Sequence, residues 1–161
     1  MKKNLFVMIA LLLTTSVFAQ EAEVSKLRAG LGVVYASKIE NFGLSLDGIY
    51  SFTDNWEGEL ALTHVFKKDD VKYNVVDLNA RYNFVRPVKN LAIYGLGGLA
   101  LNFVWLSDDG KSSYTQTKVG FNLGLGATYR LTDKLSLAPQ ACCMFSDDRY
   151  YRYGLAVQYQ F

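Results

Sequence analysis

Residues 119–130 read Val-Gly-Phe-Asn-Leu-Gly-Leu-Gly-Ala-Thr-Tyr-Arg, and apolar side chains occupy every second position. The positions between them hold Gly, Asn, Thr and Arg, so an extended chain would have one apolar and one polar face. This alternation predicts a β-strand, because successive side chains of a strand point to opposite faces. A helix would instead repeat its apolar residues every three or four positions.

The same period of two recurs beyond residue 20, where no stretch has the pattern of an amphipathic helix. Alternation is weakest where Gly95, Gly97 and Gly98 interrupt it. In that segment we expect the apolar face to carry Leu91, Ile93, Leu99, Leu101 and Phe103. The eight expected strands fall at residues 27–35, 42–52, 56–66, 76–84, 91–105, 119–129, 135–145 and 151–161.

The connections between these strands fall into two sets. One set consists of short polar turns, at residues 53–55, 85–90 and 132–134. The other set lies at residues 37–41, 67–72, 106–118 and 146–149, and the loop at 106–118 is the longest. Eight strands that meander in this way predict an all-β fold, an eight-stranded antiparallel up-and-down barrel, whose closure leaves no unpaired edge.

The two faces of the strands indicate which side of the barrel meets lipid. Beyond residue 20 every Lys lies in a connection or at a strand end, and the polar face is rich in Gly, Ser, Thr, Asn and Gln. Aromatic residues gather toward both ends of the apolar face. Two aromatic girdles around an aliphatic band predict a transmembrane barrel with a polar lumen. A soluble, lipocalin-like barrel in the periplasm, with its apolar face inward, is the alternative.

The first residues have the pattern of a targeting segment. Lys2 and Lys3 precede an apolar run from Leu5 to Leu13, and a small residue, Ala19, closes the segment. The run is shorter than the ~20 residues that a membrane-spanning helix needs. We therefore predict a cleaved signal peptide at residues 1–19 and a barrel domain at residues 20–161, located in the bacterial outer membrane. An N-terminal anchor is the alternative.

Length and composition exclude several classes of protein. The 161 residues suit one domain, and contents of 50% hydrophobic and 14% aromatic residues exclude disorder. Two cysteines cannot form a disulfide-rich scaffold. Without Lys2 and Lys3 the 17 basic residues fall to 15, which equals the 15 acidic ones. Such a neutral chain gives no reason to expect a nucleic-acid partner.

The polar face also carries charged residues of both signs. An eight-stranded barrel has an interior just wide enough for side chains to fill, so we predict a plugged lumen held by ion pairs. Counting back from the 67–72 connection places Glu59 roughly opposite Arg81. The predicted lumen charge network consists of Arg28, Asp47, Glu57, Glu59, Asp77, Arg81, Arg130 and Arg152.

Few residues suggest catalysis or metal binding. His64 is the only histidine, it shares a face with lipid-facing residues, and no serine adjoins it. Cys142 and Cys143 are consecutive, so their side chains point to opposite faces of a strand. The acidic pairs at residues 69–70, 108–109 and 147–148 suit loops, with cation binding near lipopolysaccharide as the alternative reading. We expect no catalytic residue, no cofactor and no metal site.

Four stretches, at residues 91–95, 120–126, 131–137 and 153–161, resemble the small outer-membrane barrels of the OmpX/Ail type and the membrane domain of OmpA. In such families a C-terminal Phe with apolar residues at alternate preceding positions is the signal read by the barrel-assembly machinery. The resemblance assigns that role to Tyr153, Leu155, Val157, Tyr159 and Phe161. It also implies contact with outer-membrane lipids and lipopolysaccharide, and an extracellular partner bound through the loops.

Three functions remain open from the sequence. The first is a non-enzymatic barrel that stabilises the envelope or presents its loops to a partner. The second is a narrow porin or transport barrel. The third is an enzyme that modifies lipid A.

Overall fold

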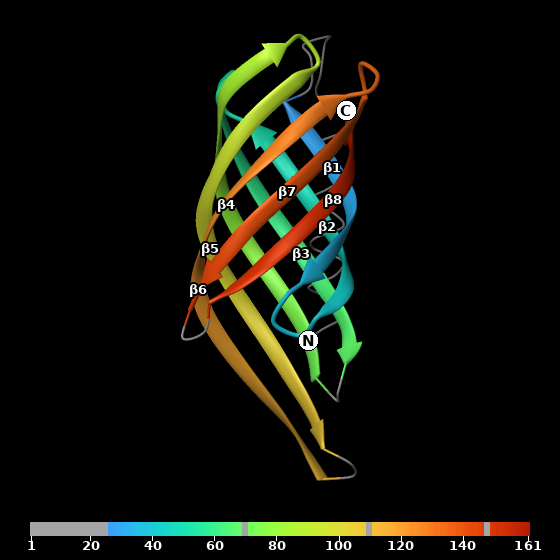
Figure 1. Ribbon diagram of the computed structural model, residues 1–161, viewed down its shortest axis with the longest axis vertical. Coiled ribbons are helices and arrows are strands. Elements are labelled where there is room, and N and C mark those ends of the chain that lie inside the picture. The colour runs from blue at the N-terminus through green and yellow to red at the C-terminus, as the bar shows by residue number, and fades with distance from the viewer. Residues whose placement is uncertain (1–25, 69–70, 109–110, 147–148) are drawn as a thin grey trace, which may run out of the picture.

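The computed structural model describes residues 26–68, 71–108, 111–146 and 149–161, and these residues form a closed antiparallel barrel (Figure 1). Each strand pairs with its neighbour in the sequence, and the first strand closes on the last. The predicted all-β, eight-stranded up-and-down barrel is confirmed, while the predicted signal peptide lies outside the described residues. The strands are β1 (Leu27–Ala36), β2 (Asn41–Ser51), β3 (Trp56–Lys68), β4 (Val71–Val88), β5 (Leu91–Asp108), β6 (Lys111–Arg130), β7 (Leu135–Phe145) and β8 (Tyr150–Gln160).

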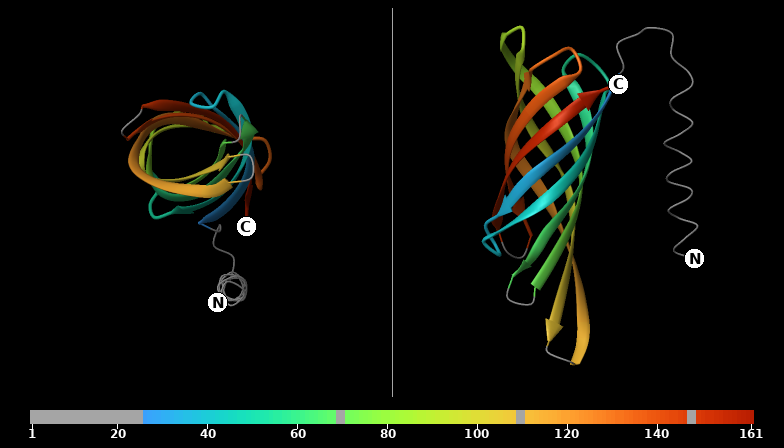
Figure 2. Two further views of the ribbon diagram at one scale, coloured as in Figure 1. Left: turned by 90° about the horizontal axis from the view of Figure 1, so that it is seen from below. Right: turned by 90° about the vertical axis from the view of Figure 1, so that its right-hand side faces the viewer.

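The two faces of the barrel wall follow the alternation in the sequence. In β1, Leu31 and Val33 are exposed on the outer surface, while Gly30 and Val34 are buried toward the lumen. An outer surface with this many exposed large apolar side chains is the surface that lipid covers in a membrane barrel. Viewed from one end, the strands enclose a ring (Figure 2).

The ambiguous phase of β5 is resolved by burial. Leu99 and Leu101 are exposed on the outer surface, whereas Tyr94, Leu96 and Ala100 are buried in the lumen. The predicted phase is therefore right. Of the glycines that made the phase ambiguous, Gly95 and Gly97 lie on the outer face and Gly98 lies on the inner face, so glycine occurs on both faces of this strand.

Two of the short turns share one hydrogen-bond pattern. In the β2–β3 turn, the amide of Trp56 donates to Oγ1 of Thr53 at 3.0 Å. In the β6–β7 turn, the amide of Leu135 donates to Oγ1 of Thr132 at 3.0 Å. The threonine hydroxyl satisfies an amide that the turn would otherwise leave free, which explains why a Thr-Asp pair begins both turns. We call this end of the barrel the turn end.

At the opposite end two predicted loops are largely strand. β3 and β4 together cover 67–68 and 71–72 of the predicted loop at 67–72, and β5 and β6 together cover 106–108 and 111–118 of the predicted loop at 106–118. The β5–β6 pairing runs out to Asp108 and Lys111, while the described β6–β7 pairing begins only at Phe121. The β5–β6 hairpin therefore projects beyond the rest of the barrel (Figures 1 and 2).

This difference has a physical reason. Beyond the membrane neither face of a hairpin has to be apolar, so the sequence loses the alternation that marks the other strands.

Among the described residues, no helix is long and apolar enough to cross a membrane.

Candidate functional site

The lumen is lined by buried polar side chains from most of the strands. Seven of the eight charged residues predicted for the lumen are buried there, and each lies on the inward face of its strand. These are Arg28 on β1, Asp47 on β2, Glu57 and Glu59 on β3, Asp77 and Arg81 on β4, and Arg152 on β8.

The first group of charges centres on Arg81, whose side chain is 0% exposed. Its Nη1 lies 3.4 Å from Oε1 of Glu59, and its Nε lies 3.7 Å from Oε2 of Glu57. Glu57 also pairs with Arg28, at 2.6 Å between Oε1 and Nη2. The guanidinium of Arg81 stacks on the ring of Tyr94, 3.7 Å from its centroid. Two arginines and two glutamates thus neutralise one another in the lumen, and an aromatic face covers the more deeply buried arginine.

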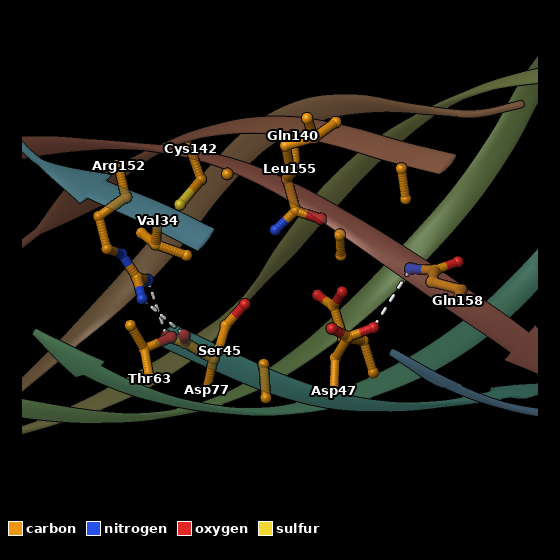
Figure 3. Close-up of a pocket in the computed structure, with 15 residues that line it drawn as sticks. Val34, Ser45, Asp47, Thr63, Asp77, Gln140, Cys142, Arg152, Leu155 and Gln158 are labelled. Carbon is orange, nitrogen blue, oxygen red and sulfur yellow. Dashed lines mark hydrogen bonds and ion pairs between the residues drawn. The ribbon is translucent and has the colours of Figure 1, made fainter. Parts of the chain in front are cut away.

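The second group is built around a two-point ion pair between β8 and β4 (Figure 3). Nη1 and Nη2 of Arg152 donate to Oδ2 and Oδ1 of Asp77 at 2.6 and 2.8 Å. Asn122 joins the pair from β6, since its Oδ1 accepts from Arg152 at 3.0 Å and its Nδ2 donates to Asp77 at 2.8 Å. Paired hydrogen bonds of this kind fix both the distance and the orientation of the two charges.

An amide chain connects the two groups. Nδ2 of Asn122 lies 3.0 Å from Oδ1 of Asn79, and Nδ2 of Asn79 donates to Oε2 of Glu59 at 2.8 Å. The network therefore continues across the lumen from Arg28 to Arg152. Asp47 lies beside it and accepts a hydrogen bond from Gln158 at 3.2 Å (Figure 3).

Glycines on the inward face make room for the large side chains that cross the lumen. Gly98 pairs with Asn79 on one side and Asn122 on the other. A Cβ at position 98 would lie 2.6 Å from the Cα of Asn79. Gly126 pairs with Tyr94, and a Cβ there would lie 2.7 Å from its Cε2 atom. At these positions, glycine on the inward face leaves the space that a bulky side chain on the neighbouring strand occupies.

Toward the projecting hairpin the lumen becomes apolar. Val75, Ala100, Met144 and Tyr150 form a buried cluster, and the hydroxyl of Tyr150 donates to Oδ1 of Asn102 at 2.9 Å. The sequence reasoning missed this cluster, although a signal for it exists. Where two large apolar residues follow one another, one must point inward, as in the pairs Val33-Val34, Val65-Phe66, Val75-Val76, Phe103-Val104 and Tyr150-Tyr151.

A cavity of about 60 Å³ lies beside the charged network (Figure 3). Asp47, Glu59, Asp77, Arg152 and Gln158 are among the residues that line it. This volume has room for a few water molecules among polar partners. The largest fully buried side chains of the described residues, Arg81 and Tyr94 among them, also lie in the lumen.

Two details of the predicted network are wrong. Arg130 is exposed at the last position of β6, beside the turn, and forms no ion pair among the described residues. Glu59 stands opposite Asn79, while Glu57 stands opposite Arg81. The register shifts between Val65 and Lys68, so counting equal steps from the loop gives the wrong cross-strand position, although Glu59 still forms an ion pair with Arg81.

The other candidate residues that the structure describes show no catalytic or metal-binding arrangement. His64 is exposed on the outer surface, with Nδ1 2.6 Å from Oδ1 of Asn74. Cys142 is buried, Cys143 is half-buried, and both thiols are free. Within the described ranges, no three His, Cys, Asp or Glu residues are grouped so as to hold a metal ion. The acidic pairs at 69–70 and 147–148 lie outside those ranges, as does the second residue of the pair at 108–109.

A closed eight-stranded barrel with an apolar outer surface and a polar, charged lumen defines a transmembrane β-barrel. The sequence pattern of the outer membrane protein beta-barrel domain family matches residues 6–141, and the chain belongs to this family. The family is one of bacterial outer-membrane proteins, which agrees with the predicted location in that membrane. No curated protein sequence matches the chain.

Solved structures with the same fold include three bacterial barrels. The N-terminal barrel domain of Pseudomonas aeruginosa OprF is 22% identical, with a TM-score of 0.70 over 86% of this chain and 100% of that one. Neisserial surface protein A is 18% identical, with a TM-score of 0.72 over 87% and 100%. The attachment invasion locus protein of Yersinia pestis, solved with a heparin analogue, is 17% identical, with a TM-score of 0.60 over 84% and 96%. At these identities the likeness shows the fold alone.

Proposed function

We propose that this protein is a non-enzymatic, non-conducting barrel of the outer membrane that holds the β5–β6 hairpin outside the cell. The observation that carries the proposal is the filled lumen. Ion pairs occupy it from Arg28 to Arg152, and the apolar cluster around Met144 occupies it on the hairpin side. A lumen filled in this way favours a structural role over that of a porin.

The projecting hairpin supports a role in surface interaction. Barrels of this kind have short turns on the periplasmic side and longer connections on the extracellular side. By this rule the turn end faces the periplasm and the β5–β6 hairpin faces outward. Residues 114–117 of β6 pair with β5, whereas the described pairing with β7 begins at Phe121. One side of this stretch therefore presents a strand edge to which an extended peptide can add.

Two further partners are part of the proposal. The outer surface would contact outer-membrane lipids, with lipopolysaccharide on the extracellular side. The residues Tyr153, Leu155, Val157, Tyr159 and Phe161 are all exposed on that surface, which suits recognition by the barrel-assembly machinery before insertion. A lipid-modifying enzyme is disfavoured, because the described contacts of the His64 ring are with the amide of Asn74 and the ring of Phe66, and neither is a nucleophile.

Conductance in a planar bilayer tests the proposal. The purified wild-type protein should insert without sustained current. A variant in which residues 106–113 are replaced by an Asn-Gly turn should also insert and stay silent, because the lumen network lies outside the deleted segment. Stable, reproducible channels from the wild-type protein would contradict the plug and support the porin function.

A second measurement addresses the envelope. In a strain that lacks the protein, we expect increased sensitivity to detergent if the barrel stabilises the membrane. Both the full chain and the hairpin-trimmed variant should then restore resistance. If the trimmed variant alone fails to restore it, the hairpin is needed for the envelope role.

A further inference from the structure

The turn end of the barrel opens into a polar cup with a volume of about 310 Å³. This cup is separate from the small cavity described above, and the ends of several strands and turns contribute to it. Four cationic side chains and two carboxylates line it: Arg28, Arg86, Lys89, Arg130, Asp54 and Glu57. The cup therefore has an excess of positive charge, and its volume lies at the lower end of the range of about 300–1,000 Å³ for small-molecule sites.

Few of these cations are neutralised by a carboxylate. Glu57 is engaged by Arg28 at 2.6 Å and by Arg81 below it. Arg86 donates through Nη2 to the main-chain carbonyl of Asp54, which leaves its charge without a carboxylate partner. Lys89 and Arg130 form no ion pair among the described residues.

The backbone holds Lys89 and Arg130 at one part of the rim. The amide of Arg130 donates to the carbonyl of Asn90 at 2.7 Å, so the end of β6 lies against the β4–β5 turn. Lys89 from the β4–β5 turn and Arg130 from the end of β6, both without an ion pair to a described residue, thus reach the same cup. The hydroxyl-bearing residues Thr128 and Ser136 line the cup beside them.

We propose that this cup binds a small multivalent anion, through carboxylate or phosphate groups, from the side of the membrane that the turns face. Arg130 supplies a planar fork of donors that matches either group at two points, and Lys89 adds a compact charge. Arg28 and its partner Glu57 line the cup and also belong to the lumen network, so the cup adjoins the network at the turn end. Binding in the cup needs no passage through the plugged lumen.

Calorimetric titration of the full chain tests this site. The protein is refolded in a non-ionic detergent at low salt and titrated with pyrophosphate and, separately, with citrate. We expect saturable binding of at least one probe, and the probe that binds more tightly identifies the preferred group. Arg130→Gln and Lys89→Gln should each weaken binding by about tenfold, the loss expected for one hydrogen bond to a charged group.

Lys134→Gln is the matched control. Lys134 is a cation at the same end of the barrel, but its Nζ lies over the ring of Tyr159, 5.8 Å from the centroid, and it does not line the cup. Its substitution should leave the affinity unchanged. All variants are first compared on unboiled gels, so that a loss of binding is read only from folded protein.

Two results would overturn the site. One is the absence of saturable binding of either probe at millimolar concentration. The other is equal weakening by Lys134→Gln, which would show that the cations act only as solvated surface charge. Repeating the titration in nanodiscs of anionic phospholipid distinguishes the sources of the anion. An unchanged affinity supports a soluble ligand, and a reduced affinity supports a lipid headgroup with the same chemistry.

Discussion

At the scale of single residues, the lumen shows how a small barrel carries charge in its interior. Removing a charged group from water costs several kcal/mol, so a buried charge is stable only with a close partner and further hydrogen bonds. Arg152 has both, from Asp77 and Asn122. Arg81 has two carboxylates and an aromatic ring instead.

The substitution Arg81→Ala should lower the free energy of unfolding by about 3–5 kcal/mol, the range for removing one partner of a buried ion pair. The cost arises because Glu57 and Glu59 would keep their charges with less compensation. Urea unfolding in detergent or lipid vesicles measures it. Arg130→Ala is the control: this exposed arginine forms no ion pair with a described residue, and its substitution should change stability by no more than about 0.5 kcal/mol. Equal effects of the two substitutions would contradict the assigned network.

Two glycines of β5 should respond oppositely to alanine. Gly98→Ala should destabilise the barrel by about 1–3 kcal/mol, the usual cost of overpacking, because the added methyl group meets the backbone of β4. Gly95→Ala should be neutral or stabilising by up to about 1 kcal/mol, since a Cβ there lies 3.8 Å from the nearest atom, Cε1 of Phe84. The same unfolding measurement tests both. A destabilisation at position 95 as large as that at 98 would argue against this account.

At the scale of strands, alternation in the sequence predicts the wall of the barrel well, because lipid on one side and a polar lumen on the other impose opposite demands on neighbouring residues. The phase of β5 could be predicted in this way even through its glycines. The extent of β5 and β6 could not, because their outer parts meet no lipid. The predicted pairing of Glu59 with Arg81 is present as an ion pair at 3.4 Å. The strand register beside it was predicted wrongly, since the irregularity near Val65 depends on local backbone geometry rather than on residue type.

The C-terminal strand offers a test of its own. Deleting Phe161 should reduce the amount of protein inserted in the outer membrane while export across the inner membrane continues. Phe161 ends the exposed apolar face of β8, and its amide also donates to the carbonyl of Leu27 at 3.3 Å. Quantitative blotting of membrane fractions measures the effect. Phe52→Ala removes another exposed aromatic ring from the turn end and should leave insertion near the wild-type level; normal levels of the truncated protein would contradict the prediction.

At the scale of the whole molecule, the eight strands form one closed ring, and β6 lacks a described partner on its β7 side only in the projecting hairpin. The ring itself has no free edge from which SDS can open it at room temperature. Unboiled protein isolated from outer membranes should therefore migrate differently from boiled protein on an SDS gel. Co-migration of the two samples would contradict a closed barrel in the native membrane.

The pairing of β1 with β8 has a consequence for how the chain reaches this structure. Arg28 stands beside Gln160, although nearly the whole described chain separates them in sequence. Every other pair joins two strands that are consecutive in the sequence, so its formation closes only a short loop. The β1–β8 pair closes the longest loop among the strand pairs. Contacts of such high sequence separation slow folding, since chain entropy is lost before the contact forms. Sealing of the seam between β1 and β8 is therefore expected to be the last and slowest step, and until then both strands remain open to pairing with another chain.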